Sequence, residues 1–256
     1  MTTAALIEAA VRRDRLFATL GLAAVATLAW VWLLTAGRVA DDDMPMPMFM
    51  AWTPGHAMMM LLMWWIMMAA MMLPAAAPIL LLQAATQRRR QPAAWPYPAL
   101  VLATAGYLGI WGLFSLAATA AQWALERTGL VDSMSMTAGD ALAGALLLGA
   151  GFYQFTPLKQ ACLRHCRSPL AFVATHWRPG AMGALRMGVV HGAWCLGCCW
   201  LLMALLFVGG VMSPFWIGAL ALYVLLEKLG PHGDRLGRAA GLLLLAAGCL
   251  LLWQAA

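Results

Sequence analysis

Charged side chains are scarce in this sequence of 256 residues, in which Asp, Glu, Lys and Arg together supply only 10%. A soluble domain has about 25% charged residues, which face water. Hydrophobic residues supply 64% of this chain instead, and the mean hydropathy is +0.80. The lack of charge therefore excludes an ordinary soluble domain and predicts an integral membrane protein.

Sequence signatures of several protein classes are also missing. There is no Gly-rich phosphate loop, no nucleotide-binding motif and no heptad array. There is also no Ser/His/Asp set, no nucleophile elbow and no pair of carboxylates within an apolar run, so hydrolytic catalysis has no support. The net charge of +6 comes from basic residues that flank the apolar runs, which is typical of membrane proteins. We therefore expect neither an enzyme nor a nucleic-acid-binding protein.

Seven apolar runs predict an all-α fold, namely a polytopic bundle of about seven transmembrane helices. The first run has no clean small-residue cleavage site after it, so we expect a retained span and not a removed signal peptide. Two Gly/Ala-rich runs, the fourth and the seventh, predict close helix packing. The whole chain, residues 1–256, is expected to form a single membrane domain. The seven runs lie at 16–36, 55–83, 98–124, 138–158, 188–211, 214–228 and 238–254.

The basic residues are distributed unevenly between the two sides of this bundle. When the chain is traced from span to span, 14 of the 16 Lys and Arg residues share the side of the N-terminus, and only Arg38 and Arg127 lie opposite. The positive-inside rule then places the N-terminus in the cytoplasm and the C-terminus outside. We expect a multi-pass protein of the inner (cytoplasmic) membrane, with the lipid bilayer around it and a long cytoplasmic loop at 159–187.

Methionine is concentrated in one part of the chain. Twelve of the 19 methionines lie between Met44 and Met72. Thioether sulfur is a soft ligand that suits Cu(I), whereas flexible methionine side chains also fill gaps between packed helices. Packing is the favoured interpretation for the methionines within the span, and a metal-collecting role is favoured for those in the acidic outer loop, which has no core to fill. The candidate ligands are Met44, Met46, Met48 and Met50 in the outer loop, His56 at the start of the second span, and Met59, Met63 and Met67 within it.

Five of the six cysteines fall in two short segments, KQACLRHCRSP and HGAWCLGCCW. Cys162 and Cys166 share a helix face if the fourth span continues past its apolar run, and Cys195 and Cys199 share a face of the fifth span, with Cys198 adjacent. If the two helices are neighbours, their thiolates would form a four-coordinate site suited to Cu(I) or Zn. The sequence therefore predicts a soft-metal site between the fourth and fifth spans.

A longer series of potential ligands follows the same face of the fifth span. Residues four apart lie one above the next on a helix, and five such positions hold sulfur or imidazole groups. The alternative is that buried cysteine behaves as a small hydrophobe and the histidine as a polar core residue. Disulfides are disfavoured because pairs at i, i+4 have poor geometry and the cytoplasm is reducing. The series is Met187, His191, Cys195, Cys199 and Met203.

Two further features concern the last spans. Glu227 and Lys228 are adjacent at the end of the sixth span, and we expect a neutralised pair there in preference to a proton relay. Cys249 stands alone in the seventh span, where we expect it to contribute packing only.

Three segments together resemble a bacterial family of metal-binding integral membrane proteins: WWIMMAAMMLPAAAP, YQFTPLKQACLRHCRSPL and GAWCLGCCWLLMALLFVGGVM. The resemblance covers roughly residues 45–252. Some members of that family are described as copper-chaperone-like proteins that accompany polyphenol oxidases. The resemblance implies a metal role for the five clustered cysteines and for the Met-rich second span.

The leading hypothesis is a membrane protein that binds and handles Cu(I). It would deliver copper to an extracytoplasmic copper enzyme or chaperone, or move copper across the membrane. One alternative is a membrane thiol–disulfide relay that uses the Cys-x-x-Cys spacing of Cys195 and Cys198. Another is a structural subunit whose methionines and cysteines only pack. Metal analysis of the purified protein separates the three hypotheses.

The proposed orientation can be tested with reporter fusions. A reporter fused after Arg90 is expected to be active in the cytoplasm, and one fused after Met48 outside it, because the basic residues hold the Arg90 side in the cytoplasm. Paired alkaline phosphatase and green fluorescent protein fusions provide the measurement. The reverse pattern would invert the assignment of every ligand to a side of the membrane.

Overall fold

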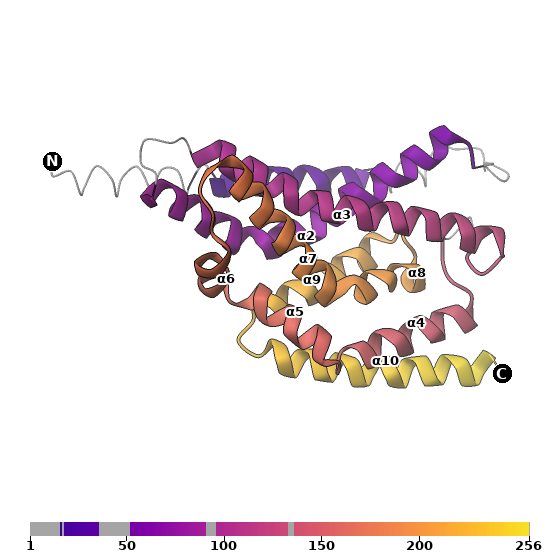
Figure 1. Ribbon diagram of the computed structural model, residues 1–256. Coiled ribbons are helices and arrows are strands. Elements are labelled where there is room, and N and C mark those ends of the chain that lie inside the picture. The colour runs from indigo at the N-terminus through magenta and orange to yellow at the C-terminus, as the bar shows by residue number, and fades with distance from the viewer. Residues whose placement is uncertain (1–15, 17, 36–51, 91–95, 133–135, 256) are drawn as a thin grey trace.

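The computed structural model describes residues 16, 18–35, 52–90, 96–132 and 136–255, and these form a bundle of helices (Figure 1). In this part of the chain the regular structure is helical, apart from one isolated bridge between Val131 and Ala138. The all-α prediction is therefore confirmed. After an N-terminal helix, Ala18–Thr35, the helices are α2 Pro54–Arg90, α3 Pro96–Arg127, α4 Asp140–Tyr153, α5 Pro157–Arg167, α6 Pro169–His176, α7 Gly180–Ala204, α8 Leu206–Gly209, α9 Pro214–Leu229 and α10 Gly233–Ala255.

The helix expected across residues 138–158 is broken. Helix α4 ends at Tyr153, and α5 begins at Pro157 with its axis turned by 67°. Proline lacks a backbone N–H and disfavours helical geometry in the residue before it, so it begins a helix more readily than it continues one. The Thr156 side chain caps the new helix by accepting a hydrogen bond from the Lys159 backbone N–H.

The prediction of a loop at residues 159–187 is also wrong, because most of this segment is helical. Helix α5 continues to Arg167, Pro169 begins α6, and Gly180 begins α7. The helical segment that was expected to start near residue 188 therefore starts two turns earlier. The apolar runs did not predict these helices, because α5 is amphipathic and carries basic residues, and α6 has only 8 residues.

Small residues allow two pairs of helices to pack closely. Between α3 and α7, a Cβ built at Gly188 would lie 1.9 Å from the Ala103 carbonyl oxygen. Between α4 and α10, a Cβ built at Gly248 would lie 3.0 Å from the Gly144 carbonyl oxygen. Side chains at these positions would separate the helix backbones. The close packing predicted for the fourth and seventh spans is thus confirmed as the contact between α4 and α10.

Five described helices are long and apolar enough to cross a membrane: Ala18–Thr35, α2, α3, the α7–α8 segment and α10. The bent pair α4–α5 would make a sixth. Helix α9 has 16 residues and is shorter than a typical span of about 20 residues. The composition is that of a membrane protein, while the seven-span count and the orientation stay predictions.

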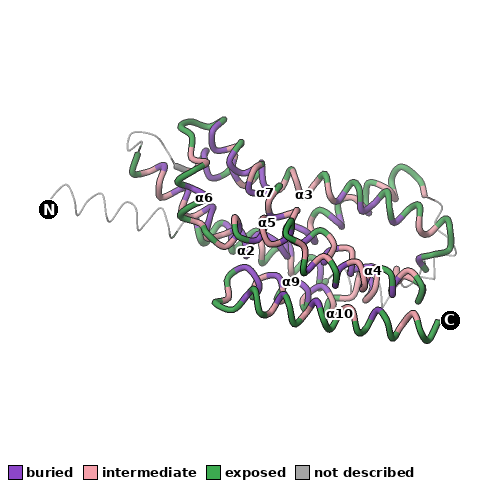
Figure 2. The backbone as a smooth tube through the Cα atoms, turned by 60° about the horizontal axis from the view of Figure 1, so that its bottom comes forward, coloured by how far each residue is buried: buried purple, intermediate pink, exposed green. Residues whose placement is uncertain are grey.

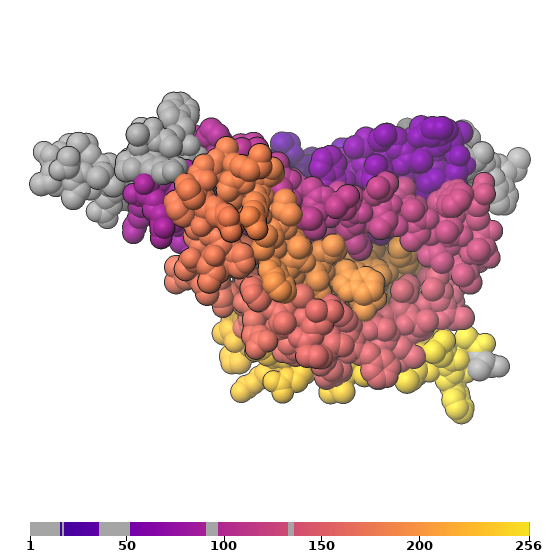
Figure 3. Space-filling model, in the orientation of Figure 1, coloured from indigo at the N-terminus to yellow at the C-terminus, as the bar shows by residue number. Residues whose placement is uncertain are grey.

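The bundle is layered around α7. Figure 1 shows α2 and α3 along one side and α4 and α10 along the other, with α7 and α9 between them. On the face shown in Figure 3, side chains of α7 lie between those of α3 and those of α4 and α5. Exposed residues follow the outer side of α10, whereas buried residues concentrate between the helices (Figure 2). The core of the bundle therefore surrounds the cysteines of α7.

Replacing Gly188 by alanine is expected to lower the free energy of unfolding by about 1–3 kcal/mol, because a methyl group there collides with α3. Thermal unfolding in detergent micelles measures the effect. Gly149→Ala is the matched control, since no atom lies within 4 Å of a Cβ built at that position of α4. Equal destabilisation by both substitutions would contradict the packing described for α3 and α7.

Candidate metal site

The bend before α5 places two cysteines against the middle of α7. Cys162 and Cys166 lie on one face of α5, and each is 4% exposed. A Cβ built at Gly197 of α7 would lie 2.7 Å from the Cys162 sulfur. Glycine at position 197 therefore lets this sulfur approach the backbone of α7 more closely than any other residue would.

Three more cysteines lie on α7 itself, and all are buried. Cys195 is 1% exposed, and Cys198 and Cys199 are fully enclosed. Cys198 Sγ donates to the Cys195 carbonyl oxygen at 3.0 Å, and Cys199 Sγ donates to the same oxygen at 2.9 Å. The two thiols therefore turn back towards the preceding helical turn, where the Cys195 side chain begins.

The two cysteine groups meet between α5 and α7. Helix α5 packs along α7, and the Cys162 sulfur lies against the α7 backbone at Gly197, which stands between Cys195 and Cys198 in the sequence. The prediction that the CLRHC and CLGCC segments come together is confirmed, and we call Cys162, Cys166, Cys195, Cys198 and Cys199 the sulfur cluster.

Polar groups from two other helices reach the sulfur cluster. Lys228 of α9 places its Nζ 2.9 Å from Cys195 Sγ and 3.9 Å from Cys199 Sγ, although the lysine is only 4% exposed. The hydroxyl of Tyr107, on α3, lies 3.0 Å from Cys195 Sγ and 3.2 Å from the Met72 carbonyl oxygen. Cys195 is therefore the point at which α3, α5, α7 and α9 meet, beside α2.

His191 lies one turn before Cys195 on the same face of α7 and is 3% exposed. Its ring lies 5.1 Å from the ring of Tyr107 and 5.4 Å from that of Phe172, measured between centroids. Its Nδ1 has no hydrogen-bond partner in the described part of the chain. An imidazole nitrogen next to the sulfur cluster is thus available as a further soft-metal ligand.

The sulfur cluster does not form a closed coordination shell. Within the described ranges, no three His, Cys, Asp or Glu side chains are arranged to hold a metal ion. The geometry explains this, because two thiols turn towards a backbone oxygen and the Lys228 ammonium contacts a third sulfur. Chemically, the arrangement provides buried cysteine sulfurs, which are soft ligands, with the positive charge of Lys228 beside them.

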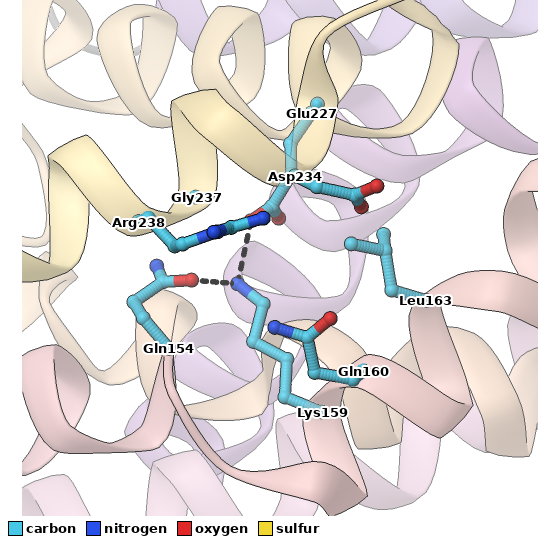
Figure 4. A pocket seen from close by; sticks show the side chains of 9 residues that line it. Gln154, Lys159, Gln160, Leu163, Glu227, Asp234, Gly237 and Arg238 are labelled. Carbon is cyan, nitrogen blue, oxygen red and sulfur yellow. Dashed lines mark hydrogen bonds and ion pairs between the residues drawn. The ribbon is translucent and has the colours of Figure 1, made fainter.

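The expected pairing of Glu227 with Lys228 is wrong. Neighbouring residues on a helix point in directions about 100° apart, and here Glu227 turns away from the sulfur cluster. Its carboxylate forms an ion pair of 2.7 Å with Lys159 of α5, which also donates to Gln154 (Figure 4). This pair lines a small pocket together with Gln160 of α5 and Arg238 of α10. Each buried charge of α9 therefore has a different partner.

The other predicted ligands lie elsewhere. Met63 and Met67 are 3% and 1% exposed and belong to the same core as the cysteines, whereas Met59 is 50% exposed on the surface of α2. His56 begins α2 and contacts the ring of Trp52. In the described part of the chain, no hydrogen bond or ring contact links these four side chains to the sulfur cluster. Met44, Met46, Met48 and Met50 lie outside the described residues.

Lys228, Tyr107 and Gly197 were not predicted as parts of the site. A lysine at the end of a short apolar run was a detectable signal, since a buried charge requires a partner, but the adjacent glutamate offered an apparent one. Nothing in the sequence marks Tyr107 or Gly197, because their contacts join segments about 90 and 35 residues apart in the chain.

Comparison with known proteins identifies one family. A family model described as PpoB2, a copper chaperone, matches residues 61–251. The matched region contains the entire sulfur cluster, Tyr107, His191 and Lys228. No curated protein and no solved structure gives a significant match.

Burial predicts a simple pattern of thiol reactivity. N-ethylmaleimide is expected to modify one cysteine rapidly in the folded, detergent-solubilised protein, because Cys249 is exposed and the five cysteines of the cluster are buried. Mass spectrometry against time gives the number of fast-reacting thiols. Cys249→Ser should remove the fast reaction, and addition of denaturant should expose the remaining five. Rapid modification of several thiols before denaturation would contradict the buried cluster.

Proposed function

The chain belongs to the PpoB2 family of copper chaperones, and from this membership we propose that its sulfur cluster binds Cu(I) inside the membrane for delivery to a copper-using enzyme. The observation that carries the proposal is the approach of the buried Cys162 of α5 to Gly197 of α7, which lies between Cys195 and Cys198 of that helix. A copper chaperone carries its metal to another protein and does not turn over a substrate, which agrees with the lack of a hydrolytic motif.

The donor chemistry favours Cu(I) as the cargo. Thiolate sulfur is a soft ligand that binds Cu(I) and Zn strongly. Lys228 places a positive charge 2.9 Å from the Cys195 sulfur. Repulsion by this charge is twice as large for a divalent as for a monovalent cation at the same distance. Attraction by each thiolate doubles as well, so the net charge of the site decides. Two thiolates and the Lys228 ammonium carry one net negative charge, which Cu(I) neutralises and a divalent Zn ion would exceed.

The same lysine gives the cluster a means of releasing its cargo. The thiolate is the metal-binding form of cysteine, and burying an unpaired charge is unfavourable. When copper leaves, the Lys228 ammonium compensates the negative charge of the thiolate that remains. Loss of the metal therefore leaves no unpaired charge in the protein core. A site with an internal counter-charge and no closed ligand shell suits a carrier better than a storage site.

The membrane setting supports delivery away from the cytoplasm. The five helices that are long and apolar enough to span, with the sulfur cluster in the middle of α7, would place the metal between the two membrane surfaces. With the orientation that the basic residues predict, α3 ends on the extracytoplasmic side. An enzyme that receives copper at that surface would obtain it without exposure of the ion to the cytoplasm.

Removing one sulfur from each helix should abolish tight copper binding. We expect Cys166→Ser/Cys195→Ser to lose the tightly bound Cu(I), because both helices must contribute charge to neutralise the ion in an apolar interior. Copper per folded protein, measured by mass spectrometry after anaerobic loading, provides the test. Cys249→Ser is the matched control and should bind as much copper as the wild type.

Substitutions in α2 should have a smaller effect. Met63→Leu and Met67→Leu are expected to slow copper exchange and leave the tight stoichiometry unchanged, because neutral thioethers bind more weakly than thiolates. Leucine has a similar volume to methionine, so the loss of stability should stay below about 1.5 kcal/mol. Unchanged copper content in the double cysteine variant would contradict the sulfur cluster as the binding site. Thiol counts that change with redox conditions but without copper would favour a thiol–disulfide relay instead.

A further inference from the structure

A second group of sulfur ligands converges on Gln122, a fully enclosed residue of α3. Its Nε2 lies 3.8 Å from Met60 Sδ and 3.8 Å from Met136 Sδ. The same nitrogen donates to Glu126 Oε1 at 2.8 Å. Because both sulfurs contact one nitrogen, they lie at most twice 3.8 Å apart. Two thioethers and one carboxylate, from α2, α3 and the turn before α4, are therefore gathered around one point.

The orientation of Gln122 is fixed from its other side. Trp64 Nε1 donates to Gln122 Oε1 at 2.8 Å, so the amide NH2 group must face the sulfurs and the carboxylate. Thioether sulfur is a weak hydrogen-bond acceptor. The lone pairs of both sulfurs are therefore only weakly engaged, and a soft cation would bind them better than an amide does.

The backbone of Met136 is held in an unfavourable conformation. Its φ is +50°, in the left-handed region that residues other than glycine rarely adopt. Two hydrogen bonds fix this turn to the segment after α7: Ala138 N–H donates to the Phe207 carbonyl at 2.6 Å, and Val211 N–H donates to the Met136 carbonyl at 3.4 Å. Strain that is maintained by surrounding contacts is concentrated at functional sites. Here it accompanies the placement of the Met136 sulfur beside Gln122.

Glu126 adds a negative charge to this group. Its second oxygen accepts a hydrogen bond of 2.7 Å from Trp52 Nε1. Within the described ranges no basic side chain forms an ion pair with it, and the neighbouring Arg127 lies over the ring of Trp123 instead. The carboxylate is thus available to neutralise a monovalent cation bound by the two sulfurs.

His56 supplies a fourth potential ligand at the edge of the group. It lies one turn before Met60 on the same face of α2, and its ring contacts Trp52 at 5.1 Å between centroids. The His56 Nδ1 is buried and has no hydrogen-bond partner in the described residues. The His56 Nδ1 is therefore available as a ligand.

We propose that Met60, Met136 and Glu126 form a second Cu(I) site, with His56 at its edge, from which the ion exchanges with the receiving protein. The identity of the metal rests on the proposed function of the sulfur cluster. Two neutral thioethers and one carboxylate give a neutral complex with Cu(I), which is the condition for burying the ion at low cost. A single weak anionic ligand binds less tightly than a group of thiolates, so the site suits exchange.

The two sites are connected through α2. Met60 and Met72 are separated by 12 residues, or about 18 Å along a helix, and the Met72 carbonyl is the group that Tyr107 links to Cys195. Met63, Met67 and Met71 lie between them, and each is at most 3% exposed. Their spacing of four residues, about 6 Å of helix rise, places a buried thioether at each turn between the second site and the sulfur cluster.

Competition between the full-length protein in detergent and a chromogenic Cu(I) chelator tests the second site. The wild type is expected to show a tight and a weaker class of bound copper. Met60→Leu/Met136→Leu should raise the dissociation constant of the weaker class at least about tenfold, and Glu126→Gln should do the same because it removes the charge but keeps the shape. Met59→Leu, which changes an exposed neighbour on α2, is the matched control and should leave both classes unchanged.

The same titration in Cys166→Ser/Cys195→Ser separates the two proposals. Loss of the tight class alone in this variant, with loss of the weaker class alone in Met60→Leu/Met136→Leu, supports both sites. A weaker class that persists in the double methionine variant overturns the second site and leaves the proposed function intact. A tight class that persists in the double cysteine variant, while the methionine variant loses the weaker class, overturns the sulfur cluster and leaves the second site.

Discussion

Pro157 cannot continue the hydrogen bonding of α4, and the resulting bend of 67° turns α5 across the bundle. Without this turn, a straight helix would carry Cys162 and Cys166 out of the bundle along with its basic residues. The bend directs them onto α7 instead, where Gly197 leaves space for the Cys162 sulfur. The sulfur cluster, the ion pair of Lys159 and the packing of α9 all depend on this change of direction.

Buried charge imposes a second constraint, which α9 meets with two different partners. Glu227 pairs with Lys159, while Lys228 contacts the sulfur of Cys195. A charge in the interior of such a bundle is tolerated only when another charge or polar group compensates it. The short helix α9 therefore connects two polar groups that lie in different directions from it. The sulfurs of Met60 and Met136 also contact a nitrogen donor, the Gln122 amide, just as the Cys195 sulfur contacts the Lys228 ammonium.

The two proposed sulfur sites differ in charge, so the affinity for Cu(I) is expected to fall from the sulfur cluster to the site at Gln122. The sulfur cluster offers five cysteine sulfurs that can become thiolates, whereas the site at Gln122 offers two neutral thioethers and one carboxylate. Methionines buried along α2 lie between them, in the same core as the cysteines. Packing and metal binding are compatible uses of these side chains, since a thioether that fills a gap in a core retains its lone pairs.

The sequence by itself determined the helical membrane character, the approach of the two cysteine segments and the soft character of their ligands, because apolar runs, four-residue spacing and sulfur chemistry are local properties. It could not show that Lys228 faces Cys195 while Glu227 faces Lys159, since adjacent residues diverge on a helix and their partners lie on other helices. It also gave no means of seeing that Met59 is exposed, whereas the neighbouring Met60 is buried and meets Met136 around Gln122. Only the tertiary structure decided these contacts, because the rotation of one helix against another is set by packing and backbone bends over the whole bundle.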